Sequence, residues 1–146
     1  MPAVYTIGTQ GKSLAEFITA LRGSGVEAVI DIRLRNTSQL AGYSKRDDLA
    51  FLLREGFRIA YEHRPELAPT PEVLDAYRQD RDWSAYEQRF LPLLAARHAE
   101  ILGQILLEHY RAPCLLCSEA TPTHCHRRLV AEYWAAKLSD VTIVHL

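Results

Sequence analysis

Short apolar runs alternate along the chain with segments in which apolar residues recur every three or four positions. The runs predict five strands, at residues 4–7, 26–32, 57–61, 114–117 and 141–146. The segments between them predict helices at residues 14–22, 47–55, 72–110 and 125–137, the third interrupted near Trp83 and at Pro92. A strand, a helix and a strand within about thirty residues indicate a right-handed crossover to parallel pairing. The pattern therefore predicts an α/β domain with three layers, α/β/α, around a mostly parallel central sheet of about five strands.

Three details of the pattern concern helix ends, a helix face and a loop. Ser13 stands three residues before Glu16, the spacing of a capping box, so the first helix is expected to begin directly after Ser13. A continuous helical stripe of apolar residues is expected over residues 91–106, with His98 on it. Residues 33–43 show neither the periodicity of a helix nor that of a strand, so they predict a long loop. Loops of this length often carry function.

The overall composition is that of an ordinary globular domain. The chain has 146 residues, 48% of them apolar, and a formal net charge of −1, so one domain over residues 1–146 is expected. This balance gives no general attraction to nucleic acid or to an anionic membrane. No apolar run approaches the roughly 20 residues of a membrane span, and the start lacks a signal-peptide pattern. Three cysteines are too few and odd in number for a disulfide framework, so a reduced, cytoplasmic protein is expected.

Residues 117–128, C-S-E-A-T-P-T-H-C-H-R-R, concentrate the reactive groups of the chain. The fourth strand ends at Cys117 and the last helix begins near Cys125, which is where an open α/β sheet binds its ligands. Cys117 has cationic neighbours that favour the thiolate, so it is the candidate nucleophile or redox thiol. Glu119 and His126 are the candidate proton carriers. A buried, inert Cys117 and a reversible disulfide with Cys125 are the alternatives.

Charged residues at other predicted strand ends extend this candidate site. Arg127 and Arg128 occupy the first turn of a helix, where the helix dipole disfavours cations, so a bound anion would explain them. Asp31 and Arg33 end the second strand, and His145 ends the last. Together these residues predict a pocket at the carboxyl ends of strands two, four and one. Its expected ligand is small and anionic, either phosphate-bearing or nucleotide-like.

The cysteine and histidine spacings imitate two zinc motifs, and neither is favoured. Cys114 and Cys117 have the C-x2-C spacing of a metal site, but side chains three apart on a strand point to opposite faces. Residues 98–100 (H-A-E) followed by residues 113–117 (P-C-L-L-C) imitate the paired motifs of zinc nucleobase deaminases. In those enzymes P-C-x-x-C opens a helix, whereas here it lies in a predicted strand. No metal ligand is therefore assigned.

Several short motifs, in order along the chain, resemble those of the domain of unknown function 488 family. They are Thr6-Ile7-Gly8, Asp31-Ile32-Arg33 with Ser38 following, residues 49–61, Leu115-Leu116-Cys117-Ser118-Glu119, Cys125-His126-Arg127 and Val144-His145-Leu146. The C-x-E and C-H-R motifs are the specific part. The resemblance implies a compact α/β domain in which one region is lined by Asp31, Arg33, Cys117, Glu119, Cys125, His126 and Arg127. Ser38 and His145 complete the set of candidate ligand-binding residues.

Three functional interpretations remain open. The first is an enzyme or sensor that binds a small anionic ligand and uses Cys117. The second is a non-catalytic module for nucleic acid or a protein partner, with a local basic face made by Arg33, Arg35, Lys45, Arg46, Arg127 and Arg128. The third is a metal-binding protein. The sequence assigns no cofactor, substrate or oligomeric state.

Overall fold

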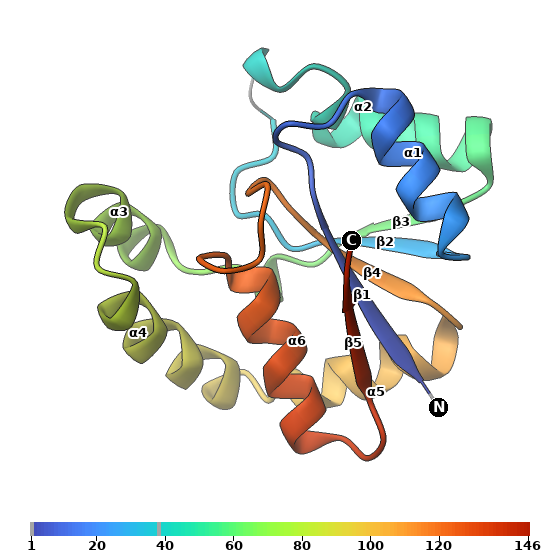
Figure 1. The fold of residues 1–146 in the computed structure, drawn as a ribbon. Helices are drawn as coiled ribbons and strands as arrows, with labels where there is room; N and C mark the ends of the chain where they lie inside the picture. Colours follow the sequence, from blue (N-terminus) through green and yellow to red (C-terminus); the bar gives the residue numbers. More distant parts are fainter. Residues whose placement is uncertain (1, 38) are drawn as a thin grey trace.

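A five-stranded parallel sheet organises the fold (Figure 1). The computed structural model describes residues 2–37 and 39–146. The strands are β1 (Ala3–Gly8), β2 (Ala28–Asp31), β3 (Ala60–His63), β4 (Pro113–Cys117) and β5 (Thr142–His145), and they lie in the order β3-β2-β4-β1-β5. The helices are α1 (Leu14–Gly23), α2 (Arg46–Phe51), α3 (Pro71–Asp80), α4 (Trp83–Ala96), α5 (Ala99–His109) and α6 (His126–Lys137). Every strand pair in this sheet is parallel, because each connection crosses over through helical segments.

Helices cover both faces of the sheet, and each face has its own apolar core. α1 and α2 lie on one face, and α5 and α6 lie on the other (Figure 1). Along β4, Cys114 and Leu116 pack against the α1 side, whereas Leu115 packs against the α6 side with Trp134. Adjacent residues thus alternate between the two cores, as strand geometry requires. The predicted three-layer α/β/α architecture is confirmed.

The first helix begins as the sequence predicts. The backbone N–H of Glu16 donates to Ser13 Oγ (3.1 Å), and the backbone N–H of Ser13 donates to Glu16 Oε1 (2.9 Å). This reciprocal pair is a capping box, which satisfies two backbone donors that the helix itself leaves free. The buried side chains of Phe17, Ile18 and Leu21 then fix α1 against the sheet.

The predicted position of the third strand is wrong by three residues at its start. The strand was expected at residues 57–61, and β3 occupies Ala60–His63 at the sheet edge. The reason is that α2 continues into a π-helical turn, Leu52–Gly56, so the chain reaches the sheet later. The backbone then turns toward the sheet at Arg58, which has a positive φ of 55°.

The predicted continuous stripe over residues 91–106 is also wrong. The chain turns at His98, which has a φ of 52° and separates α4 from α5. Beyond this turn Ile101 and Ile105 are 57% and 53% exposed, so they do not continue the buried face of α4. Pro92 lies inside α4. Within the described residues, no single helix is both long and apolar enough to cross a membrane.

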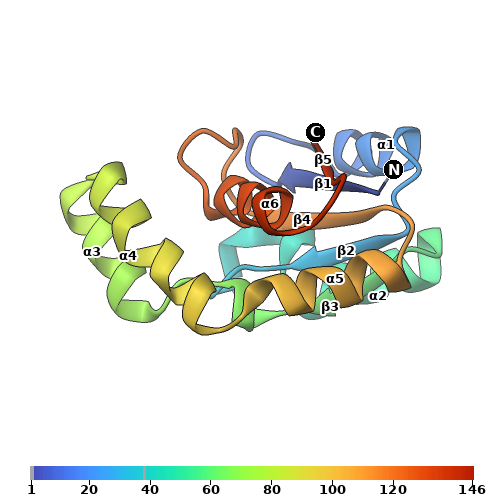
Figure 2. The ribbon, with the colours of Figure 1, turned by 90° about the horizontal axis from the view of Figure 1, so that it is seen from below.

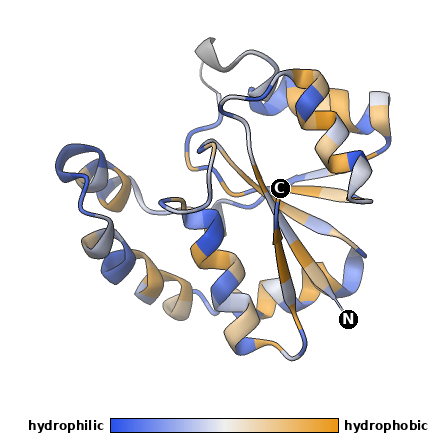
Figure 3. Cartoon of the chain, viewed as in Figure 1, coloured by the Kyte–Doolittle hydropathy of each residue, from blue (hydrophilic) through white to orange (hydrophobic). Residues whose placement is uncertain are grey.

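α3 and α4 form an arm that extends from the sheet in both views (Figures 1 and 2). The arm projects on the side where the carboxyl ends of β2 and β4 lie, and its side chains share a pocket with those strand ends. The strands are predominantly hydrophobic, whereas the outer end of the arm is hydrophilic (Figure 3). The arm therefore adds a wall of aromatic, apolar and basic side chains to a site whose base belongs to the sheet.

Candidate functional site

A pocket of about 320 Å³ lies at the carboxyl ends of β2 and β4. The residues that follow these strands form its base, together with the N-terminus of α6. α3, α4 and the residues between them supply the opposite wall. The location agrees with the general rule for parallel α/β sheets, whose ligands bind at the carboxyl ends of the strands.

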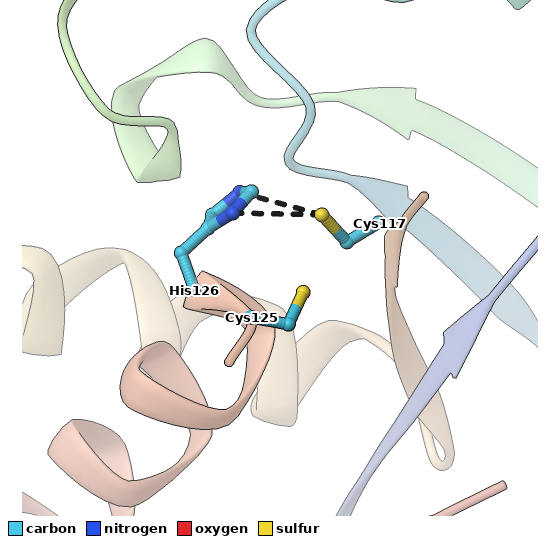
Figure 4. A group of neighbouring side chains, drawn as sticks. All are labelled: Cys117, Cys125 and His126. Carbon is cyan, nitrogen blue, oxygen red and sulfur yellow. Dashed lines mark hydrogen bonds between the residues drawn. The ribbon is translucent and has the colours of Figure 1, made fainter. Parts of the chain in front are cut away.

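Two cysteines and a histidine meet at the base of this pocket (Figure 4). Cys117 is the last residue of β4, Cys125 is the N-cap of α6, and His126 is its first residue. The sulfur and ring-nitrogen ligand atoms of the three residues lie within 4.8 Å of one another. The crossover from β4 to α6 thus brings together groups that are eight or nine positions apart in the sequence.

The tautomer of His126 follows from its backbone contact. Its Nε2 lies 2.6 Å from the carbonyl oxygen of Ile32. Because a carbonyl oxygen only accepts hydrogen bonds, Nε2 carries the proton in the neutral ring. Nδ1, which lies 3.5 Å from Cys117 Sγ, is then left with its lone pair toward the thiol. The end of β2 therefore orients the imidazole that faces the end of β4.

The surroundings favour the thiolate of Cys117 over that of Cys125. A hydrogen bond from Cys125 lowers the pKa of Cys117, and the backbone of Ser118 and the charge of Arg127 lower it further, against the opposing effect of burial. The same contact with Cys117, together with burial, raises the pKa of Cys125. Of the two thiols, that of Cys117 is therefore the more acidic.

Arg127 is fully buried beneath this cluster. Its Nη1 donates to the carbonyl oxygen of Glu119 (2.5 Å) and lies 3.7 Å from Cys125 Sγ, while its Nε donates to Thr6 Oγ1 (3.2 Å). Among the described residues, its Nη2 has no hydrogen-bond partner. The guanidinium thus ties the loop after β4 to β1 and places a positive charge beside the thiols.

Thr6 links Arg127 to the edge of the sheet. Thr6 Oγ1 accepts from Arg127 Nε and makes a second hydrogen bond with Nδ1 of His145, 2.6 Å away. Burial and the charge of Arg127 lower the pKa of His145. His145 therefore supports the site through two hydrogen bonds in series.

Asp31 and Arg33 form a buried ion pair at the end of β2. Nε and Nη2 of Arg33 donate to the two carboxylate oxygens of Asp31, each at 2.9 Å, and Tyr61 and Asn36 also donate to this carboxylate. Burial alone would raise the pKa of Asp31, but the hydrogen bonds and charge of Arg33 outweigh it and lower the pKa. Arg33 lines the pocket, and Asp31 lies behind it as its anchor.

One known protein family matches a part of the sequence that includes this site and most of the fold. The sequence model of a family described as Domain of unknown function DUF488 matches residues 13–134. The chain belongs to this family. The DUF488 match includes both the end of β4 and the start of α6, and the family description names no activity. Neither a curated protein nor a solved structure matches the chain.

The candidate residues of this DUF488 domain fall into three groups. Those that line the pocket are Arg33, Cys117, Glu119, Cys125 and His126. Asp31 and Arg127 are buried behind it, and His145 is connected to Arg127 through Thr6. Ser38 lies outside the described residues. The end of β1 supplies no described residue of the lining, so strands two and four define the pocket.

The anion expected beside the arginines at the start of α6 is not needed to explain Arg128. Arg128 donates to Glu132 on its own helix and to Glu87 on α4, at 3.1 Å in each case. Its guanidinium also lies over the ring of Trp83. Carboxylates of the protein thus neutralise Arg128, which clamps α6 to the arm.

Sequence reasoning missed the wall that the arm provides. Trp83 is stacked between Tyr86 (ring centroids 4.8 Å apart) and His124 (5.2 Å), and all three rings line the pocket. The arginines that the arm and the loop after β2 add are Arg35, Arg78 and Arg81. The signal was the run Y-R-Q-D-R-D-W-S-A-Y at residues 77–86, which gathers aromatic and basic residues in a helical region.

Proposed function

We propose that the protein is a thiol-dependent enzyme for a small anionic compound, with Cys117 as its nucleophile. The proposal rests on one relationship, the 3.5 Å approach of Cys117 Sγ to the lone-pair nitrogen of His126 at the base of a pocket. A thiol beside an oriented imidazole is the arrangement by which cysteine nucleophiles are activated. The Ile32 carbonyl plays the part of the third, orienting group.

The charge of the pocket supports an anionic ligand. Four arginines line it, at positions 33, 35, 78 and 81, against one carboxylate residue, Glu119. Guanidinium groups bind carboxylates and phosphates through paired hydrogen bonds. Arg33 and Arg35 already bind Asp31 and Asp75, so Arg78 and Arg81 on the wall are the principal candidates for direct contact with the ligand.

The proposed reaction is a nucleophilic displacement. Nδ1 of His126 takes the proton of the Cys117 thiol, and the thiolate forms a bond to the electrophilic atom of the substrate. The leaving group departs with its bonding electron pair and receives a proton from the imidazolium. Water then attacks the covalent intermediate, with His126 as base, and restores the thiol. Cys125 stays protonated beside Cys117 and takes no part in these proton transfers.

Alkylation by iodoacetamide tests the nucleophile. At pH 7, with a chelator present, Cys117 is expected to react several-fold faster than free cysteine, with the modified residue identified by mass spectrometry. His126→Gln keeps an amide near the Ile32 carbonyl but provides no base, so it should slow the reaction. Cys114→Ala is the matched control, because this third thiol faces the other core and should not contribute. A Cys117 that reacts no faster than free cysteine would refute the proposal.

The alternative of a nucleic-acid-binding face gains no specific support. The basic residues expected to form it are bound within the protein, in the pairs Arg33–Asp31, Arg35–Asp75, Lys45–Asp48, Arg46–Asp47 and Arg128–Glu87. Arg127 is fully buried. Phosphate binding depends on exposed cations that release counterions, so the two buried arginines, Arg33 and Arg127, cannot contribute to such a face.

A further inference from the structure

The same three side chains at the base of the pocket are also of the types that bind metal ions. We infer that Cys117, Cys125 and His126 form a three-residue Zn²⁺ site, and that the bound metal blocks the thiol of Cys117. The metal site itself depends on geometry alone. Its inhibitory effect rests on the proposed function, because only a nucleophilic thiol can be blocked in this sense.

The distances suit tetrahedral zinc. Zinc–sulfur bonds of about 2.3 Å and zinc–nitrogen bonds of about 2.05 Å, at the tetrahedral angle, separate the sulfur and nitrogen atoms by about 3.6 Å. Cys117 Sγ and His126 Nδ1 are 3.5 Å apart, and the whole set of ligand atoms lies within 4.8 Å. Only Cys125 Sγ needs to adjust, and Figure 4 shows it directed toward the other two groups.

The environment of the histidine is that of a metal ligand. Histidines that bind metals usually donate their second ring N–H to a carbonyl or carboxylate, which fixes the tautomer and the ring plane. Nε2 of His126 makes such a bond to the Ile32 carbonyl, at 2.6 Å. Nδ1 is therefore available to an ion without rearrangement of the ring.

The donor set selects a particular class of metal. Two sulfurs and one imidazole favour zinc over magnesium or calcium, which prefer oxygen ligands. Two thiolates also balance the charge of Zn²⁺, and the Arg127 guanidinium, 3.7 Å from Cys125 Sγ, favours the second thiolate. Cys114 does not participate, because it packs in the core on the opposite face of the sheet.

The fourth coordination position would border the pocket. All three ligands are buried, yet all three line the pocket, so an ion between them is reached from the pocket. Three protein ligands with a fourth position open to a small molecule distinguish such a site from the closed, four-ligand structural zinc sites. In the bound state the Cys117 electron pair is committed to the metal and is not available for attack on a substrate.

Cobalt substitution tests the site without reference to activity. Co²⁺ added to the chelator-treated protein should give a thiolate-to-cobalt charge-transfer absorption at one equivalent per chain, and Zn²⁺ should displace it. Cys117→Ser and Cys125→Ser should each lose this band, whereas Cys114→Ala should keep it. Circular dichroism of each variant confirms that it is folded. Absence of the band in the wild-type protein, or its persistence in a folded Cys117→Ser variant, would overturn the inference.

Alkylation of the wild-type protein separates the two proposals and needs no variant. One equivalent of Zn²⁺ should slow iodoacetamide modification of Cys117 by at least tenfold, and a chelator should restore it. A reactive thiol that Zn²⁺ does not protect overturns the metal inference and leaves the proposed function standing. A thiol that is slow without metal, in a protein that still shows the cobalt band, refutes the proposed function and leaves the metal site.

Discussion

Arg33 and Asp31 are joined by two parallel hydrogen bonds, Nε to Oδ1 and Nη2 to Oδ2, each 2.9 Å long. Their side chains are only 5% and 0% exposed. Arg33 lines the pocket, whereas Asp31 is fully buried at the end of β2. The ion pair therefore holds the Arg33 side chain in a fixed position relative to the sheet. This makes Asp31 a positioning residue, with consequences for both stability and pH dependence.

Removal of the charge at Asp31 should destabilise the fold. Asp31→Asn leaves the guanidinium of Arg33 buried without its counter-charge, which typically costs about 3–5 kcal/mol. The free energy of unfolding, measured with urea at pH 7, should fall by that amount. Asp47→Asn is the control, since Asp47 is 88% exposed in its pair with Arg46 and such pairs contribute little. Equal losses in the two variants would contradict the prediction.

Acid should remove the contribution of Asp31. Its pKa in the folded protein lies below the ordinary 3.8, so below that pH the unfolded chain binds the proton more readily than the folded one. The stabilisation is therefore complete above about pH 4 and is lost as pH falls through the folded-state pKa. In thermal unfolding from pH 7 to pH 2, the difference in melting temperature between the wild type and Asp31→Asn should become smaller below pH 4. A difference in melting temperature that stays constant over this pH range would mean that Asp31 is not ionised in the native state.

A methyl group at Gly8 should disrupt the loop that carries the site. A Cβ at this position would lie 1.6 Å from the carbonyl oxygen of Glu119 and 2.7 Å from Arg127 Nη1. Backbone must move to relieve the first contact, so Gly8→Ala should cost at least about 2 kcal/mol of unfolding free energy and slow the alkylation of Cys117.

Gly23→Ala is the matched control for that substitution. Gly23 ends α1, and apart from its chain neighbours and the backbone of its own helix, no described atom lies within 4 Å of a Cβ built there. This variant should be as stable as the wild type or up to about 1 kcal/mol more stable, because alanine restricts the unfolded chain. Equal behaviour of the two glycine variants in urea unfolding would show that Gly8 does not approach the Glu119 carbonyl.

The arginines of the arm should make the pocket selective for anions. The ratio of the iodoacetate to the iodoacetamide rate at Cys117 should exceed the same ratio for glutathione, because iodoacetate carries a negative charge. Arg78→Gln should lower this ratio about two- to threefold, the effect of one screened charge across a pocket. Arg89→Gln removes an equal charge from α4 outside the lining and should leave the ratio unchanged. Equal changes in both variants would indicate only an effect of net charge.

The fold was predictable from the sequence because its signals are local. The apolar run of residues 26–32 and the spacing of Leu14, Phe17 and Leu21 report a buried strand and an amphipathic helix directly. The third strand was misplaced because periodicity does not reveal the π-helical turn before it. The turn at His98 was missed for a similar reason, since no glycine marks its positive φ.

The site was predictable only in part. Cys117, Cys125 and His126 are brought together by one strand–loop–helix unit, so their sequence proximity was informative. The pocket wall depends on how the arm folds over the sheet, and local patterns do not determine that packing. The role of Arg127 could not be read from charge alone, because its partners Thr6 and the Glu119 carbonyl are set by tertiary structure.

The order of the strands has a consequence for biosynthesis. β4 lies in the centre of the sheet, and β1 pairs only with β4 and β5. During translation β1 therefore remains without a neighbour until about a hundred further residues have left the ribosome, while β2 and β3 can already pair. Unpaired strands are prone to aggregation, so the nascent chain is expected to need chaperone protection until Cys117 emerges. The strand that ends at Cys117 is thus the one that joins β1 to β2, before β5 is added at the edge.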